Sequence, residues 1–297
     1  MLREQYDFIL FDRMEKIKSI NEKYDLNKNA YISFSGGLDS TVLHYLIDKA
    51  LPNNTIPRVY CNTGIEYKMI TDFVKSFDDK RFEIIKPEKG VKNTLEEVGY
   101  PFKSKQHSAN LSIYQRNGMT KTNINYLGDG TKDNYLCPNC LKYQFTEDFN
   151  LKISDRCCFE FKKKPFKKYM KESSRFVTIT GMRQAEGGLR NNLSCIITDK
   201  DRNLTKFHPM AVVNNEFIEE FIKIENIEIC ELYKPPYNFK RTGCKGCPFN
   251  KDLQKDLQVL NLLLPNEKKA CEVIWSRVYG EYRRIGYRLG QRTLFEE

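Results

Sequence analysis

The sequence predicts an α/β protein in which a parallel sheet carries helices on both faces, followed by a cysteine-rich C-terminal extension. Short apolar runs typical of strands alternate with segments of helical periodicity, and ten cysteines include a Cys-x-x-Cys pair near residue 245. Strands that alternate with helices generally pair in parallel. With 297 residues, 40% of them apolar, the chain has room for one large domain, or for one domain and a small appendage.

The expected elements follow in order. Residues 1–29 repeat apolar side chains at helical spacing and predict a helix. The next segments predict a strand at 30–34, a helix at 41–49, a strand at 57–62, a helix at 66–77, a strand at 82–85 and a helix at 91–98. Residues 100–135 are polar and rich in Gly and Asn, so we expect a helix and then a mobile insertion. Beyond it we expect a basic helix at 157–173, strands at 176–180 and 193–197, a helix at 215–225, a loop at 233–250 and a helix from 265.

A glycine turn joins the first predicted strand to the next helix. The string Ser35–Thr41 reads Ser-Gly-Gly-Leu-Asp-Ser-Thr. Glycines let a ligand approach the backbone, and the N–H groups at a helix start attract anions. The hydroxyls add donors, whereas Asp39 repels phosphate, so we expect it to orient the loop or to meet a metal ion. A Walker loop requires Gly-Lys-Ser/Thr after a spacer, and no such string occurs.

The charge balance suggests anionic partners. An excess of Lys and Arg gives a net charge of +10, which favours nucleotides, nucleic acid or both, although an ordinary lysine-rich surface fits as well. The basic run at 162–171 leaves the same alternatives open. So do three arginines expected on one helical face near Trp275: Arg277, Arg284 and Arg288. No apolar run is long enough to span a membrane and the polar N-terminus is unlike a signal peptide, so we expect a cytoplasmic protein with no membrane partner.

The second strong signal is two close pairs of cysteines: Cys157 and Cys158, then Cys244 and Cys247. Four thiolates can hold a [4Fe–4S] cluster or a zinc ion. Adjacent cysteines strain a small tetrahedral zinc site and suit a cubane better, but a buried Cys-Cys and an unrelated redox or zinc pair stay an alternative. A further pair, Cys137 and Cys140, predicts a redox or sulfur-carrying site, half of a zinc site, or two reduced thiols. We expect the others to be buried small hydrophobes: Cys61, Cys195, Cys230 and Cys271.

The chain resembles the assimilatory adenylylsulfate (APS and PAPS) reductase family. Its tandem cysteines, long spacer and Cys-x-x-Cys-Pro resemble the family's iron–sulfur pattern, and Ser35–Ser40 resembles the PP-loop of the ATP-pyrophosphatase superfamily. Further segments resemble the family in the same order: Asn62–Glu66, Gly99–Lys105, Lys152–Lys167, Gly181–Arg190, which reads as the substrate-binding arginine loop, and His208–Met210 with Tyr233. The resemblance covers roughly residues 30–250.

The resemblance implies a Rossmann-like sheet of the adenine nucleotide alpha hydrolase type. We expect an N-terminal helix at 1–29, a PP-loop domain at 30–232 with an insertion at about 106–150, and a Cys-x-x-Cys loop with basic helices at 233–297. It implies these nucleotide-binding residues: Ser35, Gly36, Gly37, Asp39, Ser40, Thr41, Asn62, Thr63, Gly64, Glu66 and Arg183. It implies catalytic roles for Asp39, Ser40, Arg183 and Arg190. It also implies a [4Fe–4S] cluster on Cys157, Cys158, Cys244 and Cys247, with Cys137 and Cys140 as a candidate second metal site.

Two departures from the reductase pattern favour ATP over a sulfonucleotide. Reductases that form an S-sulfo intermediate use a cysteine in a Glu-Cys-Gly-Leu-His tail, whereas the last cysteine here is Cys271. Their loop is often degraded because their substrate lacks a β-phosphate, and here it is intact. We therefore expect ATP with Mg²⁺ to be cleaved between its α and β phosphates, for sulfur transfer from a donor to a nucleic acid or a small acceptor.

Two alternatives stay open. The first is a sulfonucleotide reductase that produces sulfite with a thioredoxin-like partner, in which Cys137 or Cys140 replaces the missing nucleophile. The second is a non-catalytic nucleotide- or nucleic-acid-binding component of a larger assembly.

Overall fold

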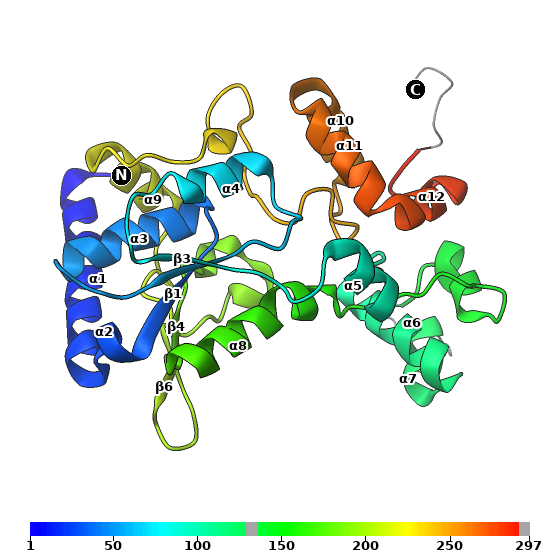
Figure 1. Ribbon diagram of the computed structural model, residues 1–297, viewed down its shortest axis with the longest axis horizontal. Coiled ribbons are helices and arrows are strands. Elements are labelled where there is room, and N and C mark those ends of the chain that lie inside the picture. Colours follow the sequence, from blue (N-terminus) through cyan, green and yellow to red (C-terminus); the bar gives the residue numbers. More distant parts are fainter. Residues whose placement is uncertain (129–135, 291–297) are drawn as a thin grey trace. The chain divides into compact units, whose positions relative to one another are not determined.

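The computed structural model describes residues 1–128 and 136–290. Its contacts divide the chain into two units that interleave along the sequence (Figure 1). The first unit consists of Met1–Asn62, Lys68–Lys86 and Pro165–Thr242. The second consists of Thr63–Tyr67, Pro87–Lys164 and the chain from Gly243 onward.

The first unit is built on a six-stranded sheet with the strand order β3-β2-β1-β4-β6-β5. The strands are β1 Ala30–Phe34, β2 Arg58–Cys61, β3 Phe82–Ile85, β4 Val177–Ile179, β5 Ile196–Thr198 and β6 Leu204–Phe207. Neighbouring strands run parallel, with Ile32 of β1 opposite Arg58 of β2 and Ile179 of β4, except that β5 and β6 pair antiparallel at one edge. The predicted α/β fold class with a mostly parallel sheet is confirmed.

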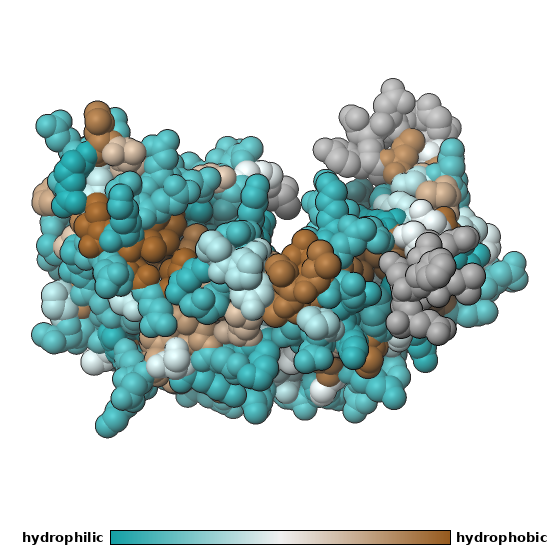
Figure 2. Space-filling model, turned by 90° about the horizontal axis from the view of Figure 1, so that it is seen from above, coloured by the Kyte–Doolittle hydropathy of each residue, from teal (hydrophilic) through white to brown (hydrophobic). Residues whose placement is uncertain are grey.

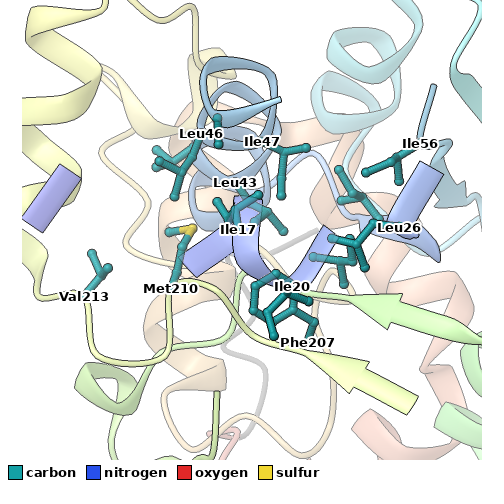
Figure 3. Packing of buried hydrophobic residues seen from close by; sticks show 14 of the residues in the cluster. Ile17, Ile20, Leu26, Leu43, Leu46, Ile47, Ile56, Phe207, Met210 and Val213 are labelled. Carbon is teal, nitrogen blue, oxygen red and sulfur yellow. The ribbon is translucent and has the colours of Figure 1, made fainter. Parts of the chain in front are cut away.

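One face of the sheet is covered by α1 Arg3–Tyr24, α3 Leu38–Ala50 and α9 Asn215–Ile224. Figure 3 shows this core, in which Ile17 and Ile20 of α1 gather with Leu43 of α3 and Phe207 of β6. Ile32 of β1 belongs to the same cluster and is fully buried. This apolar layer fixes where β1 ends and α3 begins.

The opposite face of β1 packs on α8 Lys164–Ser173. Side chains alternate across a strand, so Tyr31 points away from Ile32 and into this second layer. Its ring stacks on Phe166, with centroids 5.7 Å apart, and meets Tyr169 edge-on at 5.3 Å. Helices on both faces of the sheet are therefore observed, as predicted.

The other elements of the first unit are short: α2 Leu26–Asn29, α4 Lys68–Lys75, η3 Gln184–Glu186, η4 Gly188–Arg190 and η5 Glu231–Tyr233. In the part of the second unit that the structure describes, the elements are helical: α5 Val91–Val98, α6 Lys105–Asn117, α7 Lys121–Leu127, η1 Asn139–Phe145, the π-helical η2 Phe159–Lys163, α10 Leu253–Leu263, α11 Pro265–Ile274 and α12 Ser276–Arg284.

Several elements differ from the prediction. The N-terminal helix breaks at Asp25, whose φ of 45° ends α1. Strand β6 and helix α10 were not expected. The strand predicted at 193–197 begins only at Ile196. Where a mobile insertion was expected, Thr120 caps α7, with its side chain accepting from the Asn123 N–H. The rest of that expected insertion, 129–135, lies outside the described residues.

The surface is mostly hydrophilic on the face seen in Figure 2, with separate apolar areas. Helix α1 carries two largely exposed apolar side chains, Phe8 and Phe11, and Leu2, the residue before the helix, is exposed as well. None of the helices within 1–128 and 136–290 has the length and apolar character needed to cross a bilayer.

Candidate functional site

The predicted phosphate loop lies where the strand order reverses. β1 and β4 are neighbours, but the chain leaves β1 toward β2 on one side and continues from β4 toward β6 on the other. In open parallel sheets, ligands bind at such a switch point, beyond the carboxyl ends of the strands. Ser35 follows β1 and Gly181 follows β4 after one residue, so the PP-loop and the predicted arginine loop flank this point.

The two loop glycines meet different requirements. Gly36 has a φ of 70°, and a Cβ there would lie 2.9 Å from methyl carbons of Ile70 and Val74 in α4. Both its positive φ and its close packing against α4 therefore favour glycine at this position. Gly37 has an ordinary φ of −80° and precedes Leu38, the first residue of α3, three residues earlier than predicted. A side chain on Gly37 would instead crowd Ser35 Oγ and the Tyr233 hydroxyl, which lie 3.1 and 3.2 Å from where its Cβ would be.

The loop hydroxyls bond mainly to the loop itself. Ser40 Oγ and Thr41 Oγ1 donate to the Gly37 carbonyl at 2.9 and 3.0 Å. Ser35 Oγ lies 3.0 Å from Ser40 Oγ and accepts from the Gly37 N–H at 3.2 Å. Ser40 and Thr41 are buried. These hydroxyls therefore shape the loop, and their predicted contact with a nucleotide stays a prediction.

Asp39 joins the PP-loop to the arginine loop. Its Oδ1 accepts from Arg183 Nε at 2.8 Å. Arg183 is buried and also donates to Asn215 Oδ1 at 2.9 Å and to the Val213 carbonyl at 3.3 Å. Burial raises the pKa of Asp39, although the Arg183 guanidinium opposes this shift. Of the two roles expected for Asp39, this geometry favours orientation of the loop.

At Gly181 the arginine loop also contacts the PP-loop, here through the backbone. A Cβ on Gly181 would lie 2.7 Å from the Asp39 carbonyl oxygen, closer than real Cβ atoms approach. Only glycine therefore fits where the exit of β4 passes the first turn of α3. The Gly-x-Arg string includes Gly181. Its contact, Asp39, lies 142 positions away in the sequence, so no local signal identifies the pair.

The Glu186 carboxylate interacts with several arginines in and near the arginine loop. Its Oε1 accepts from the Arg183 N–H at 3.2 Å, and its carboxylate pairs with Arg190. Arg241 Nη2 lies 3.7 Å from Glu186 Oε2, and its side chain is 74% exposed. Arg190 and Arg241 thus present cationic surface beside the loop, whereas Arg183 is engaged by protein groups. Sequence reasoning missed Arg241, which stands two residues before the Gly-Cys string.

His208 has an unsatisfied nitrogen at the same edge of the sheet. Its Nδ1 lies 2.7 Å from Thr180 Oγ1, whereas Nε2 is buried without a hydrogen-bond partner in the described part of the chain. Burial lowers the pKa of His208 to about 4, so the ring is neutral near pH 7.

The predicted Asn-Thr-Gly-x-Glu turn divides between the two units. Asn62 ends the strand region of the first unit, where its N–H donates to the Ile85 carbonyl at 2.9 Å. Residues 63–67 belong to the second unit. There Thr63 Oγ1 donates to the Glu66 carboxylate at 2.7 Å, and Gly64 has a φ of 82°. The nucleotide contacts predicted for Thr63, Gly64 and Glu66 stay untested.

In the second unit this turn contacts the Cys-x-x-Cys loop. The Lys245 N–H donates to the Ile65 carbonyl at 2.8 Å. The C-terminal helices hold three carbonyls of the same loop: Trp275 Nε1 donates to Lys245 at 2.9 Å, Tyr279 donates to Gly246, and Tyr282 donates to Pro248 at 2.9 Å. We call these three aromatic residues the aromatic clamp. Trp275 is therefore a structural residue of the clamp.

The cysteines predicted to bind metal all lie in the second unit. Cys157 Sγ is 4.0 Å from Cys158 Sγ at the start of η2. The hydrogen bond that Cys157 donates to Cys158 raises the pKa of Cys157, with burial and the charges of Cys158, Cys247 and Cys244 acting in the same direction. The pKa of Cys158 is lowered by that same hydrogen bond and by nearby lysines, of which Lys105 contributes most.

The donor set fits an iron–sulfur cluster by its chemistry. Soft thiolates are the ligands of such clusters, and these thiols are near enough to influence one another's ionisation. None of the ten cysteines, all within the described residues, forms a disulfide. Within the described residues, however, no three Cys, His, Asp or Glu side chains converge tightly enough to form a metal site in their present conformation.

The remaining sequence candidates are distributed as follows. Cys137 is buried, and burial raises its pKa to about 11, whereas Cys140 is exposed. Burial of the cysteines expected to be hydrophobic is confirmed for Cys61, Cys230 and Cys271, but Cys195 is only partly buried. The expected arginine face is wrong in one respect, because Arg288 lies beyond the end of α12 and donates to the Pro248 carbonyl at 2.6 Å.

A family model described as the phosphoadenosine phosphosulfate reductase domain matches residues 29–127 and 133–250. The chain belongs to this family. The matched residues include the PP-loop, the arginine loop and all four predicted cluster cysteines, so the resemblance read from the sequence is confirmed.

Among curated proteins, the chain is 26% identical over 286 residues to an uncharacterized protein of Methanocaldococcus jannaschii, which covers 93% of this chain and 55% of the relative. It is 27% identical over 146 residues to the glutamine-hydrolyzing GMP synthase of Thermosipho africanus, which covers 45% of this chain and 26% of that enzyme. The chain thus spans about half of the first relative and a quarter of the second.

Two solved structures are similar at low identity. The phosphoadenylyl-sulfate reductase of Candida auris shares 15% identity, with a TM-score of 0.47 over 82% of this chain and 96% of that one. The U34-tRNA thiolase NcsA of Methanococcus maripaludis, solved with its [4Fe–4S] cluster, shares 14% identity, with a TM-score of 0.40 over 98% of this chain and 84% of that one. Such values say nothing about the activity of this chain.

Proposed function

We propose that this member of the phosphoadenosine phosphosulfate reductase family binds ATP on Ser35–Thr41, cleaves it between the α and β phosphates, and uses the activated acceptor for sulfur transfer. The observation that carries the proposal is the intact loop. At Gly37 the hydroxyls of Ser35 and Tyr233 lie 3.1 and 3.2 Å from where a Cβ would be, and the Asp39–Arg183 ion pair joins the loop to a cationic loop that carries Arg190. Helix N–H groups and arginines are suited to the charge of a polyphosphate.

The reaction asks mainly for positioning and charge neutralisation. An acceptor oxygen attacks the α-phosphorus, and the bond to the β-phosphate breaks so that pyrophosphate leaves with the electron pair. A hydrosulfide-type sulfur then attacks the acceptor carbon, and AMP leaves with the acceptor oxygen. The acceptor exchanges oxygen for sulfur, and no electrons are gained or lost. Mg²⁺ bridging the phosphates is part of the proposal.

We assign a [4Fe–4S] cluster to Cys157, Cys158, Cys244 and Cys247. Such a cluster can bind a sulfide ligand or serve as a structural link between two cysteine segments. Lysines beside Cys158 favour its thiolate, and the aromatic clamp fixes the backbone that carries Cys244 and Cys247. Ten free cysteines suit the reducing cytoplasm, where we place the protein. A nucleic acid remains our candidate acceptor because of the net charge of +10.

The second candidate is a sulfonucleotide reductase in which another thiol forms the S-sulfo intermediate. Cys140 is exposed, which keeps this alternative open. Cys137 suits it poorly, because burial raises its pKa to about 11 and leaves little thiolate near pH 7.

The test compares products from both substrates. Anaerobically prepared protein is incubated either with ATP, Mg²⁺, sulfide and total tRNA, or with APS or PAPS and reduced thioredoxin. We expect AMP and pyrophosphate from ATP and no sulfite. Sulfite production that is lost in the Cys137→Ser, Cys140→Ser double variant would overturn the proposal in favour of the reductase.

A further inference from the structure

Two hydroxyl-bearing residues, Tyr233 and Thr242, lie beside the PP-loop. Both belong to the first unit, as the loop does. The sequence pattern included Tyr233 in the family resemblance without giving it a role, and it did not indicate Thr242. A Cβ placed on Gly37 would lie 3.2 Å from the Tyr233 hydroxyl, 3.7 Å from Thr242 Oγ1 and 3.1 Å from Ser35 Oγ. Three hydroxyls therefore converge on the side of Gly37 where another residue would carry its side chain.

The Tyr233 hydroxyl also lies close to the start of α3. The backbone of Leu38 is near enough to lower the pKa of Tyr233, although burial raises it overall, and Tyr233 and Thr242 share a hydrogen bond through their hydroxyls. The Leu38 N–H is among the first of a helix and has no partner within that helix, so it is a group that a phosphate oxygen would use. The tyrosine hydroxyl therefore lies beside an N–H group that is suited to phosphate.

The segment that carries Tyr233 is held by its own backbone. The Phe239 N–H donates to the Leu232 carbonyl at 2.8 Å, and the Tyr237 N–H donates to the Lys234 carbonyl at 3.0 Å. Leu232 is fully buried, whereas Tyr233 is only partly buried. The turn therefore fixes the Tyr233 ring and leaves its hydroxyl within reach of a ligand.

We propose that the Tyr233 and Thr242 hydroxyls are phosphate-binding groups that complete the PP-loop from outside it. A phosphate oxygen that takes the Leu38 N–H would lie beside the Tyr233 hydroxyl, which can then donate to it while Thr242 donates to the tyrosine oxygen. Each hydroxyl is a neutral donor. Such a donor suits a phosphate whose charge is already balanced by arginines. This inference rests on the proposed function, because it assumes that a polyphosphate occupies the loop.

The test measures binding by calorimetry with three probes: ATP, inorganic pyrophosphate and adenosine. The variants are Tyr233→Phe and Thr242→Val, with Tyr237→Phe as the matched control in the same turn. We expect Tyr233→Phe to weaken ATP and pyrophosphate about tenfold, as loss of a hydrogen bond to a charged group does, and to leave adenosine unchanged. Thr242→Val should act in the same direction, and Tyr237→Phe should match the wild type.

The outcomes separate this inference from the proposed function. If the wild type binds ATP and Tyr233→Phe binds it equally well or more tightly, the inference is wrong and the function stands. Tighter binding would mean that the hydroxyl only competes with phosphate. If the wild type binds neither ATP nor pyrophosphate, the proposed function fails and the inference fails with it. Thermal unfolding of each variant, which should match the Tyr237→Phe control, excludes a folding defect.

Discussion

At the scale of single residues, Gly37 matters for the space it leaves open. Its φ of −80° is available to any residue, so a side chain there would not strain the backbone. The side chain would instead crowd Ser35 Oγ and the Tyr233 hydroxyl, which lie 3.1 and 3.2 Å from a Cβ there. The sequence pattern predicts that a side chain here blocks the approach of phosphate to the backbone, and the structure adds the hydroxyls that it would displace.

We therefore expect Gly37→Val to abolish nucleotide binding and turnover, and to lower the free energy of unfolding by about 1–3 kcal/mol because the valine crowds two hydroxyls, which leaves the protein folded. The matched control is Gly90→Val. Gly90 also precedes a helix with an extended backbone, and a Cβ there would meet nothing within 4 Å. Calorimetry with ATP and urea unfolding check both variants. Wild-type affinity in Gly37→Val would show that the loop is not the phosphate site.

Asp39 illustrates an ion pair that holds two loops together. Arg183 is buried, so removing its carboxylate partner leaves an unpaired cation out of water. We expect Asp39→Ala to destabilise the protein by roughly 3 kcal/mol. The control is Asp7→Ala, because Asp7 pairs with Arg3 on the exposed surface and should contribute about 0–1 kcal/mol. Equal urea midpoints for the two variants would contradict the joining role of Asp39.

At the scale of elements, the aromatic clamp connects the C-terminal helices to the proposed cluster. Tyr279 and Tyr282 bond to carbonyls on either side of Cys247. We expect the double variant Tyr279→Phe, Tyr282→Phe to lose about 1 kcal/mol per hydrogen bond and to retain iron several-fold less well in air. The control is Tyr287→Phe, whose ring lies under the Arg288 guanidinium with 5.5 Å between Arg288 Cζ and the ring centroid.

Iron and sulfide analysis after anaerobic preparation provides the measurement. We expect about four irons per chain in the wild type and the control, as four thiolate ligands of a cubane imply. The clamp account would be wrong if the double variant kept its iron as long as Tyr287→Phe does. Stoichiometric zinc without iron in the wild type would exclude the cluster itself.

Elements with strong local patterns were predictable from the sequence. β1 and β3 match their predicted bounds, because each is a short apolar run bounded by polar residues or a turn. β6 was missed because its Leu-Thr-Lys-Phe run is too brief to give a period, and its strand pairing comes from β4 and β5. The predicted site residues were found from strings, whereas Thr242 and Arg241 were missed and Tyr233 was named without a role, because these roles come from contacts distant in sequence.

At the scale of the whole molecule, the three histidines make stability depend on pH. Burial is the largest cause of each shift, and it lowers the pKa values of His44, His107 and His208 to about 4 from 6.5. Between these values the unfolded chain binds more protons than the folded chain. The stabilising effect is therefore complete above pH 6.5 and is lost as the pH falls toward 4, by about 1.4 kcal/mol per pH unit for each histidine.

The raised pKa values of Asp39 and Asp256 act in the opposite direction, because burial favours their protonated forms in the folded chain. We still expect the urea midpoint to be nearly constant above pH 7 and to fall steadily from pH 6.5 to 5, since three histidines become protonated there in the unfolded chain. NMR titration of the histidine ring protons should show little protonation of the folded state over this range. A constant midpoint would contradict the buried, neutral histidines.

Nucleotide preference tests the central claim most directly, because it needs neither the acceptor nor the sulfur donor. Calorimetry compares ATP with APS and PAPS on the anaerobically prepared protein and on Gly37→Val. We predict that the wild type binds ATP at least about tenfold more tightly than either sulfonucleotide, since an intact loop offers a place for the β-phosphate, and that Gly37→Val loses this binding. Tighter binding of a sulfonucleotide, with ATP affinity unchanged in Gly37→Val, would contradict the account.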